Sequence, residues 1–349
     1  MLRKEIIAVL ETVKPFVPGT AVQNVFRQVV FMENVACAQD GVVGMLASCP
    51  TISKSDAIAL DGVRLMEFLR CFQQDAVAIG VKNQRVQVSI DTATATFLIS
   101  EVPSGIVPKG PKRFENVGDQ FAAALRLGWD FADTSGKAGP LSCVCLMPSG
   151  IWSTDGACAT RVRMKLPISA SMVLPPRLKE VLGTLSVTGL SVDAHRLWLR
   201  GDGGVAWTSL QSFVFPDLAP VFQRATAAAK RVPAISCVDE GFRSALSAAV
   251  SAGGNFVRLV MGGDTVSFEC DGQLAQVRVG VKSGSKLPNV TFSSAAGKLV
   301  GAVGAFSSMS VCRDEGLLYF TDAVMKADHV LMEWVEGSGV GEKESAAAN

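Results

Sequence analysis

The sequence predicts an α+β fold of three similar modules of about 115 residues, each with two helices and several antiparallel strands. The same order of patterns recurs three times: an amphipathic helix, short alternating strands, a shorter helix and further strands. The two stretches that join the repeats, residues 102–113 and 223–234, are polar or rich in proline. A chain of 349 residues is also too long for one core. We place the modules at 1–113, 114–232 and 233–336, followed by a flexible tail at 337–349.

The helices are predicted from apolar residues at helical spacing. Asp61 is the expected N-cap of the second helix, because its carboxylate can accept from the free N–H groups of the first turn. Proline stands at the start of the fourth helix, where the N–H that proline lacks would have no hydrogen-bond partner within the helix. The expected helices cover residues 2–14, 61–74, 117–132, 174–185, 238–253 and 293–306.

The strands are predicted where apolar and polar residues alternate. The glycine-rich stretches 201–204 and 261–264 are interpreted as hairpin turns, because neither is followed by the Lys-Ser/Thr pair of a phosphate-binding loop. The expected strand regions are 24–34, 35–47, 76–102, 141–156, 160–168, 190–210, 257–281, 308–322 and 328–334.

The composition argues against several classes of function. The formal net charge is +1, so no overall field marks a simple nucleic-acid or membrane binder, although one basic surface is still compatible with it. His195 and His329 lie far apart, and no Cys-x-x-Cys pair occurs among nine cysteines, which argues against a metal site. No Ser-His-Asp or Cys-His set has a plausible order. We therefore predict no catalytic residue, no metal and no cofactor.

The cysteines and the N-terminus indicate the compartment. Scattered cysteines are typical of reduced, mostly buried thiols in the cytosol. Residues 1–14 read as a charged amphipathic helix and not as a signal peptide. No apolar run reaches the roughly 20 residues that a membrane span needs. We expect a cytoplasmic protein with no membrane partner.

The stretch WTSLQSFVFPDLAPVF, residues 207–222, is unusually apolar. We expect a strand over 207–215, a turn at Pro216–Asp217, and further apolar residues after Pro220. Hydroxyl groups occur here, but no histidine, cysteine or carboxylate pair that could do acid–base work. Two interpretations remain open: a simple turn that ends a strand, because proline fixes φ, or one wall of a groove for an apolar peptide.

Several stretches resemble the bacterial DNA polymerase III beta subunit, the sliding clamp. Residues 208–222 resemble the end of that family's second domain, where a Thr-Ser strand runs into Phe-Pro-Asp. Ser153–Gly156 resembles its Ala-Thr-Asp-Gly turn, and 168–185 resembles its second helix with the preceding proline. Residues 85–103 resemble the end of the first domain, and 329–332 the closing strand. The resemblance runs over residues 1 to about 335 and is most specific in the second domain.

The sequence departs from the family pattern at two places. The family continues the turn with His-Arg-Leu, whereas this chain has Ala157-Cys158-Ala159. The closing strand of the family continues Met-Pro-Met-Arg-Leu, whereas Met332 is followed by Glu333 and Trp334. Such departures would suit a phage-encoded member, and the sequence leaves the origin open.

The resemblance implies a DNA clamp fold and a non-catalytic function. Family members have three-domain protomers, two of which close head to tail into a ring around duplex DNA. The ring is a processivity factor that tethers the polymerase to its template. The implied partners are duplex DNA without sequence preference, a DNA polymerase, a clamp loader and a second copy of the chain. The implied location is the cytoplasm, on the nucleoid of a bacterial cell.

A ring that slides must contact phosphates and not base edges, so basic side chains should line its hole. Each such cation could equally be part of an ordinary solvated helix face. The candidate DNA-binding residues are Arg3, Lys4, Lys14, Arg64, Arg70, Arg126, Lys137, Arg177, Lys179, Arg243 and Lys298.

The resemblance also implies a peptide groove between the second and third domains and a dimer interface. The groove would take short apolar peptides from polymerases and the clamp loader, and its candidate residues are Thr154, Gly156, Pro216, Pro220, Val221, Val330, Met332 and Trp334. The interface would pair the last strands of domain one with the start of domain three, through Phe97, Ile99, Ala249 and Val250. The strand that carries Phe97 could instead be an ordinary internal strand.

Two alternatives to a sliding clamp remain. One is a non-ring, clamp-like interaction protein, for example a monomeric relative or a decoy. The other is an enzyme of unknown class on a repeated α+β scaffold, which the scarcity of histidine and the lack of a catalytic motif disfavour.

Overall fold

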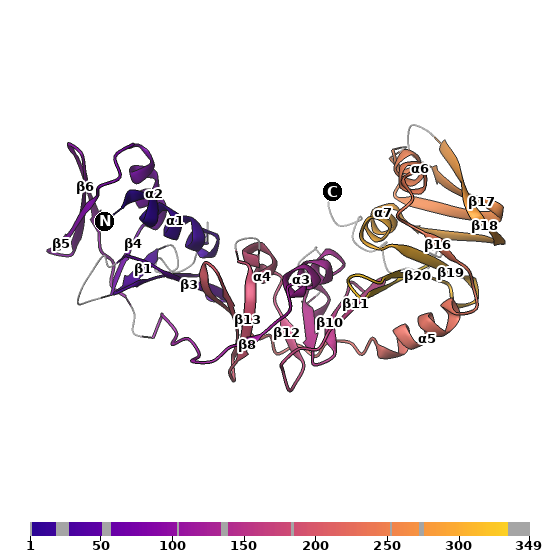
Figure 1. Ribbon diagram of the computed structural model, residues 1–349, viewed down its shortest axis with the longest axis horizontal. Helices are drawn as coiled ribbons and strands as arrows, with labels where there is room; N and C mark the ends of the chain where they lie inside the picture. Colours follow the sequence, from indigo (N-terminus) through magenta and orange to yellow (C-terminus); the bar gives the residue numbers. More distant parts are fainter. Residues whose placement is uncertain are drawn as a thin grey trace, which may run out of the picture. The chain divides into compact units, whose positions relative to one another are not determined.

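The computed structural model of the chain describes residues 2–18, 28–50, 57–102, 105–133, 139–182, 185–251, 253–271 and 276–333 (Figure 1). It divides into two compact units. Unit 1 comprises residues 1–126 and 166–213, and unit 2 comprises residues 127–165 and 214–349. Both units therefore take part of the predicted second module, whose boundaries stay a prediction. Among the described residues, no helix is both long and apolar enough to cross a lipid bilayer.

Unit 1 holds one eight-stranded sheet and one three-stranded sheet, and the strand pairs within them are antiparallel. The order of the large sheet is β4-β1-β2-β3-β15-β14-β13-β8, and that of the small sheet is β5-β6-β7. The strands of these two sheets are β1 (Val29–Met32), β2 (Val35–Gln39), β3 (Val43–Ser48), β4 (Ile58–Leu60), β5 (Ala78–Lys82), β6 (Arg85–Ile90), β7 (Ala93–Leu98), β8 (Glu115–Asn116), β13 (Val187–Val192), β14 (Arg196–Gly201) and β15 (Gly204–Ser209). Strand β12 (Met172–Leu174) also falls within unit 1 but belongs to neither sheet.

The helices of unit 1 pack on this sheet through their apolar faces. Helices α1 (Arg3–Val13) and α2 (Gly62–Arg70) lie side by side, and α1 contacts β2 and β3 (Figure 1). Ile6 and Leu10 of α1 are buried at helical spacing. The remaining elements are the short 3₁₀ helix η1 (Lys14–Phe16), α4 (Arg177–Val181) and the first turns of α3 (Phe121–Asp130), which ends in unit 2.

The large sheet of unit 1 joins strands that are distant in the sequence. β3 pairs with β15, and Trp207 lies opposite Gly44 in this pairing. The Trp207 ring covers Gly44 so closely that any side chain at position 44 would overlap the indole. Trp207 in turn packs on Trp198, with ring centroids 5.7 Å apart. The join between the first and second predicted modules is therefore a continuous, well-packed sheet.

Unit 2 also combines a large antiparallel sheet with a smaller one. Its strands run in the order β9-β10-β11-β21-β20-β19-β16, and β17 and β18 form a separate two-stranded sheet. The strands are β9 (Val144–Met147), β10 (Gly150–Thr154), β11 (Cys158–Arg163), β16 (Ala234–Ser236), β17 (Phe256–Asp271), β18 (Gln276–Ala295), β19 (Ser308–Cys312), β20 (Leu317–Asp322) and β21 (Ala327–Met332).

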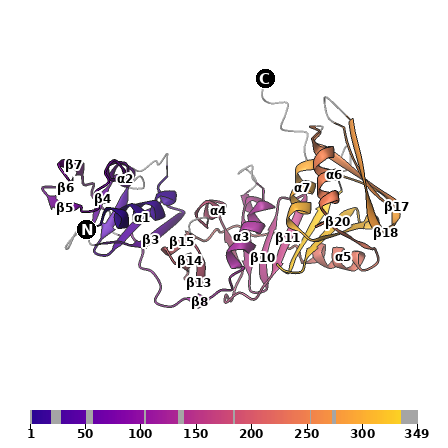
Figure 2. The ribbon, with the colours of Figure 1, turned by 45° about the horizontal axis from the view of Figure 1, so that its top comes forward.

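Helices cover both faces of the β19–β21 region of this sheet. Figures 1 and 2 show α5 (Ala219–Ala229) on one face and α7 (Ala296–Ala305) on the other, with α6 (Glu240–Val250) beside α7. The contacts of α5 with β19, β20 and β21 and of α7 with β21 agree with this view. Two 3₁₀ helices, η3 (Gly139–Ser142) and η5 (Arg313–Glu315), complete the unit.

The predicted fold class is confirmed: the chain is α+β, with antiparallel sheets and a small number of helices. The Asp61 cap is also confirmed, since its carboxylate accepts from the Arg64 N–H at 3.0 Å. The turn at residues 201–204 is confirmed as the hairpin between β14 and β15.

Three local predictions were wrong. The expected strand from Trp207 ends at Ser209. Residues 223–234 were predicted to be a joint between modules, but residues 219–229 form helix α5. Proline favours the first turn of a helix, where Pro220 stands, and the alanines that follow favour its continuation. Residues 261–264 are not a hairpin turn: β17 continues through them with a shift in register at Gly263, whose φ is +62°.

Candidate functional site

Three of the expected groove residues, Thr154, Val330 and Met332, lie on the face of the unit 2 sheet that α5 covers. Thr154 pairs with Ala159 and Ala159 pairs with Val330, so these three residues form one row across β10, β11 and β21. Side chains alternate between the two faces along a strand, so Met332 lies on the same face as Val330. Thr154 is 4% exposed, Val330 is fully buried and Met332 is 37% exposed. Of Thr154, Val330 and Met332, only Met332 is therefore open to a ligand.

The turn after β10 is fixed by its own side chains. The Thr154 hydroxyl donates to the Cys158 carbonyl at 2.5 Å and accepts from the Gly156 N–H at 3.1 Å. The Asp155 carboxylate accepts from the N–H groups of Ala157 and Cys158 at 2.9 and 2.8 Å. Gly156 has a φ of +91°, which glycine adopts without strain. Ala157 accepts from the Met332 N–H at 3.1 Å, so the turn is tied to the end of β21.

An ion pair attaches this turn to α7. The Lys298 ammonium of α7 donates to the second oxygen of Asp155, whose side chain is only 8% exposed. Burial by itself would raise the pKa of Asp155, but the hydrogen bond and charge of Lys298 outweigh it, and the net pKa is lowered. Burial would likewise lower the pKa of Lys298, but Asp155 holds it raised. Both groups are therefore charged at neutral pH, and Lys298 is committed to this turn.

Two further groove candidates, Pro220 and Val221, lie at the start of α5. The Asp217 carboxylate accepts from the Ala219 N–H at 3.0 Å, and Pro220 stands in the first turn of the helix. Phe222 is fully buried and meets the Trp152 ring edge to face, with centroids 5.5 Å apart. Because Phe222 anchors the helix, Pro220 is left exposed and Val221 half-buried at its N-terminal end.

A buried carboxylate holds α5 against the sheet. Asp328 of β21 is 1% exposed and accepts from the Arg161 guanidinium at 2.6 and 3.0 Å and from the Tyr319 hydroxyl at 2.8 Å. The Tyr319 hydroxyl also accepts from Thr226 of α5 at 3.4 Å. The Arg161 guanidinium stacks over Phe222, 4.5 Å from the ring centroid. This cluster of Arg161, Asp328, Tyr319 and Thr226 was missed from sequence, because its members are scattered along the chain.

The opposite face of β21 carries a buried histidine. His329 is fully buried among Phe131, Phe306 and Phe320, and its Nδ1 lies 2.8 Å from the Thr160 hydroxyl. Its Nε2 has no hydrogen-bond partner among the described residues. Burial lowers the pKa of His329 to about 3, so the imidazole is neutral at physiological pH. The described residues also contain no cluster of three histidine, cysteine or carboxylate side chains that could hold a metal.

Comparison with solved structures finds bacterial clamps that match almost the whole length of the chain. The beta clamp of Helicobacter pylori in complex with 3,4-difluorobenzamide matches with a TM-score of 0.79, 12% identity, and 96% of this chain and 99% of the clamp covered. The DNA polymerase III beta subunit of Pseudomonas aeruginosa matches with a TM-score of 0.77, 13% identity, and 96% and 98% covered. The Helicobacter pylori clamp bound to a DNA ligase peptide matches at 0.78, with 12% identity and 96% and 99% covered.

The chain has the sliding-clamp fold. The match extends over almost the full length of both this chain and the bacterial clamps, as the sequence resemblance predicted. No protein-family model matches the sequence, and no curated protein does either. At 12–14% identity the comparison establishes the fold, and the residues of the candidate sites must be judged on their own geometry.

Several candidate DNA-binding cations of this clamp fold are engaged within their own unit. Arg3 is 14% exposed and donates to the Leu69 carbonyl at 3.3 Å. Arg177 donates to Asp40 at 2.7 Å and to the Pro15 carbonyl at 2.8 Å. Arg126 and Arg243 donate to the carbonyls of Leu182 and Cys237 at 2.7 and 2.8 Å. These four side chains, together with Lys298, support local structure.

The other described candidate cations are exposed, as Arg126 and Arg243 also are. Lys4, Arg64 and Arg70 are 74%, 80% and 50% exposed in ion pairs with Asp75, Asp61 and Glu11. Lys14 is exposed at the start of η1, and within the part of the chain that the structure describes it makes no ion pair. Lys179 is exposed on α4. Lys137 and Trp334 lie outside the described residues.

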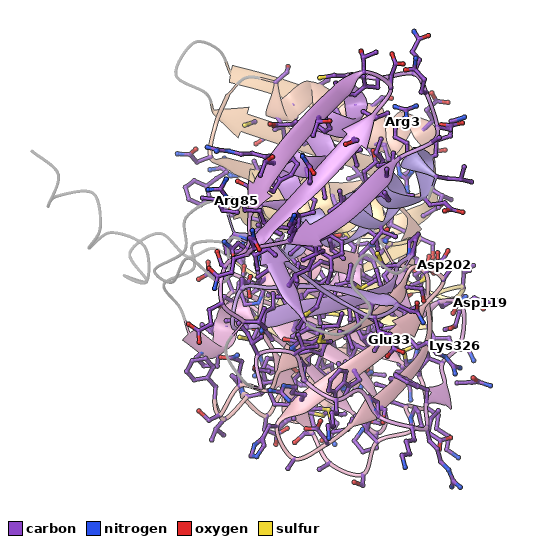
Figure 3. All side chains as sticks on the ribbon, turned by 90° about the vertical axis from the view of Figure 1, so that its left-hand side faces the viewer. Arg3, Glu33, Arg85, Asp119, Asp202 and Lys326 are labelled. Atoms are coloured by element: carbon purple, nitrogen blue, oxygen red, sulfur yellow. The ribbon has the colours of Figure 1, made fainter. Side chains whose placement is uncertain are left out.

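The candidate interface residues occupy one sheet edge and one helix end. Phe97 lies on β7, an edge of the β5-β6-β7 sheet, and its ring centroid is 6.2 Å from that of Phe68 on α2. In Figure 3 this sheet lies nearest the viewer, with Arg85 at one end of it. Ile99 follows β7 and is half-buried. At the end of α6, Val250 is half-buried, whereas Ala249 is fully buried within unit 2.

Proposed function

We propose that the protein is a DNA sliding clamp, a processivity factor that encircles duplex DNA and tethers a replicative polymerase. The observation that carries the proposal is the match of almost the entire chain to nearly complete bacterial clamps. The function is non-catalytic: the clamp keeps another enzyme on its template. Its DNA partner would place it in the cytoplasm, on the nucleoid.

The DNA contact would depend on topology and on weak, sequence-independent contacts to phosphates. A closed ring cannot leave DNA sideways, so no single cation has to bind tightly. The exposed cations Lys4, Lys14, Arg64, Arg70 and Lys179 are the best candidates, because their ammonium and guanidinium groups can reach a phosphate. The ion pairs that three of them make are exposed and therefore weak, so a phosphate can replace the carboxylate.

Polymerase and clamp loader would bind through the groove beside Thr154, Gly156, Val221 and Met332. The rigid turn at 154–158 and the anchored start of α5 provide a preformed site, which lowers the entropic cost of binding. An exposed methionine adapts to apolar side chains of different shape. A solved Helicobacter pylori clamp of the same fold holds a DNA ligase peptide, which supports a peptide-binding role.

Two copies would close the ring through the free edge of β7 and the C-terminal end of α6. Phe97, Ile99 and Val250 would contribute side chains, and Ala249, which is fully buried, would lie next to Val250 at the end of the helix. An edge strand exposes unpaired backbone groups, and a second copy would cover them. A non-ring, clamp-like interaction protein of the same fold would lack this closure.

The test measures mass and DNA retention together. Light scattering at micromolar concentration should give about twice the protomer mass of 36.7 kDa. After loading onto closed circular DNA, the protein should remain bound in high salt and be released when the DNA is cut once. A stable monomer, or equal retention on circular and linear DNA, would contradict encirclement and favour the non-ring alternative.

A further inference from the structure

A second concave site lies at the far end of α5 from the candidate groove. A cavity of about 300 Å³ opens between the C-terminal end of α5, strand β18 and the turn η5. Its apolar lining includes Ala228, Val290 and Val311, which are 5%, 7% and 2% exposed. Its polar lining includes Arg231, Arg313 and Glu315. An apolar floor with a charged rim is the composition of a site for a side chain that is part of a larger ligand.

The rim carries more positive than negative charge. Arg224 and Arg231 share one carboxylate, that of Glu315, at 3.1 and 3.8 Å, and their side chains are 51% and 67% exposed. Lys230 and Arg313 are exposed, and within the described residues neither makes an ion pair. Asp314 is the other carboxylate in this cavity. Arg231 and Arg313 line the cavity together with the two carboxylates, and Arg224 and Lys230 lie at its margin, so the surplus charge is positive and would attract an incoming acidic group.

A stripe of exposed residues joins this cavity to the candidate groove. On a helix with 3.6 residues per turn, positions 220, 224 and 227 of α5 lie on one face, and Arg231 follows in the turn after its end. Pro220, Arg224, Ala227 and Arg231 are all exposed. The eleven residue steps from Pro220 to Arg231 span roughly 16 Å at the rise of a helix. About five residues of an extended peptide cover the same distance.

We propose that the clamp partner's peptide continues past the groove along α5 and places acidic residues, about four to six positions from its apolar anchor, in the cavity between Arg231 and Arg313. This inference rests on the proposed function, because it extends the same peptide. Apolar residues would bind beside Met332 and Val221. The acidic residues would then supply further carboxylates to Arg224 and Arg231, which now share the single carboxylate of Glu315.

A nucleic acid is the less suitable occupant of this cavity. Asp314 and Glu315 alternate with the arginines of the rim, so a row of phosphates with one charge each must pass close to them, whereas one or two peptide carboxylates can be placed beside Arg231 and Arg313 alone. The buried alanine and valine floor offers nothing to a phosphate but suits the methylene groups of glutamate or a neighbouring apolar side chain. The observations therefore favour an acidic peptide.

Selection from a phage-displayed library of random 16-residue peptides tests the proposal on the full-length protein. Wild-type protein should enrich an apolar motif together with an excess of Asp and Glu four to six positions away. Arg231→Ala/Arg313→Ala should keep the apolar motif and lose the acidic excess. The matched control Arg258→Ala/Lys326→Ala removes two exposed cations elsewhere in unit 2 and should select the wild-type pattern.

The outcomes separate this inference from the proposed function. An apolar motif without acidic enrichment on wild-type protein would overturn the inference and leave the groove intact. Enrichment of no apolar motif, or the same selection on Met332→Ala as on wild type, would count against the groove itself. Loss of the acidic excess with the control variant would show that the cavity is not its source.

Binding of one selected peptide gives a quantitative check. Replacing its acidic residues by Asn and Gln should weaken binding to wild type about fivefold in fluorescence anisotropy at low salt. The same replacement should change binding to Arg231→Ala/Arg313→Ala less than about twofold. Equal losses on both proteins would overturn the proposal. A labelled DNA duplex whose binding falls only in the arginine variant would identify a nucleic-acid site instead and also overturn it.

Discussion

Arg161 and Asp328 are 167 positions apart in the sequence and lie opposite each other on β11 and β21, with Arg161 Nη2 2.6 Å from Asp328 Oδ2. Removing the carboxylate would leave a guanidinium that is only 20% exposed without its main counter-charge. We expect Asp328→Ala to lower the free energy of unfolding of unit 2 by about 3–5 kcal/mol. Urea unfolding followed by tryptophan fluorescence measures this loss.

The matched control is an exposed ion pair of the same length. Glu11 and Arg70 are also 2.6 Å apart, but both side chains are about half exposed. Glu11→Ala should therefore cost less than about 1 kcal/mol. If the two substitutions cost the same, burial of Asp328 has no influence on the strength of its pair.

His329 should make stability depend on pH. Its pKa is lowered from 6.5 to about 3 in the folded state, so between these values the unfolded chain takes up a proton that the folded chain does not. Stability should therefore fall as the pH decreases from about 6.5 towards 3, by at most about 1.4 kcal/mol per unit. His329→Phe, which joins three phenylalanines, should flatten this slope. His195→Gln changes an exposed histidine and should keep the wild-type slope; identical slopes for all three proteins would contradict the prediction.

The features that could be predicted from sequence are those that depend on neighbours along the chain. Asp61 caps α2 because its side chain reaches an N–H only three residues away. Residues 201–204 form a hairpin because glycine suits such a turn. The alternation of apolar residues in 85–98 predicted strands β6 and β7 for the same local reason.

Predictions from local sequence were wrong where the same residue types are typical of two different local structures. Alanine with a nearby proline and cations is typical of a linker, yet it is also a good helix, and α5 forms because Phe222, Ala225 and Ala228 bury one face on the sheet. Two consecutive glycines favour a hairpin, but at Gly262–Gly263 the partner strand β18 continues the pairing through a bulge.

The core of the candidate site depends on non-local pairing that no local pattern contains. The row Thr154–Ala159–Val330 exists because β11 pairs with β21. Lys298 was predicted to be a DNA-binding cation because it stands on a helix. Only the fold shows that Asp155 lies beside it. Its DNA role stays a prediction, with a competing structural role now visible.

Cys71 should be the one thiol that reacts quickly in the folded protein. It is exposed, whereas the other eight cysteines are buried. Burial raises the pKa of Cys37 to about 12 and that of Cys49 to about 11, so these thiols are also protonated at neutral pH. Titration with a chromogenic disulfide should show one fast equivalent, which Cys71→Ser removes. Several fast equivalents in the Cys71→Ser protein would contradict the burial of the others.

Gly44 should be intolerant of any side chain. A methyl group at this position would overlap the Trp207 ring on the paired strand β15. We expect Gly44→Ala to destabilise unit 1 by about 1–3 kcal/mol and to shift tryptophan emission. Gly80→Ala is the control, because a methyl group on that exposed strand position meets no atom within 4 Å. Equal stability of the two variants would contradict the prediction, because it would mean that β3 and β15 move apart around the methyl group without loss of stability.

Lys14 and Lys298 should behave in opposite ways if the protein is a clamp. Lys14 is exposed without an ion pair among the described residues, so Lys14→Ala should leave stability unchanged. If it contacts a phosphate, the same change should reduce the slope of log affinity against log salt on closed circular DNA by about 0.9. Lys298→Ala leaves Asp155 buried without its cation, so it should cost about 1–3 kcal/mol of stability and leave the salt slope unaltered. The reverse result, a stable Lys298→Ala protein with a reduced salt slope, would return Lys298 to the DNA surface and remove Lys14 from it.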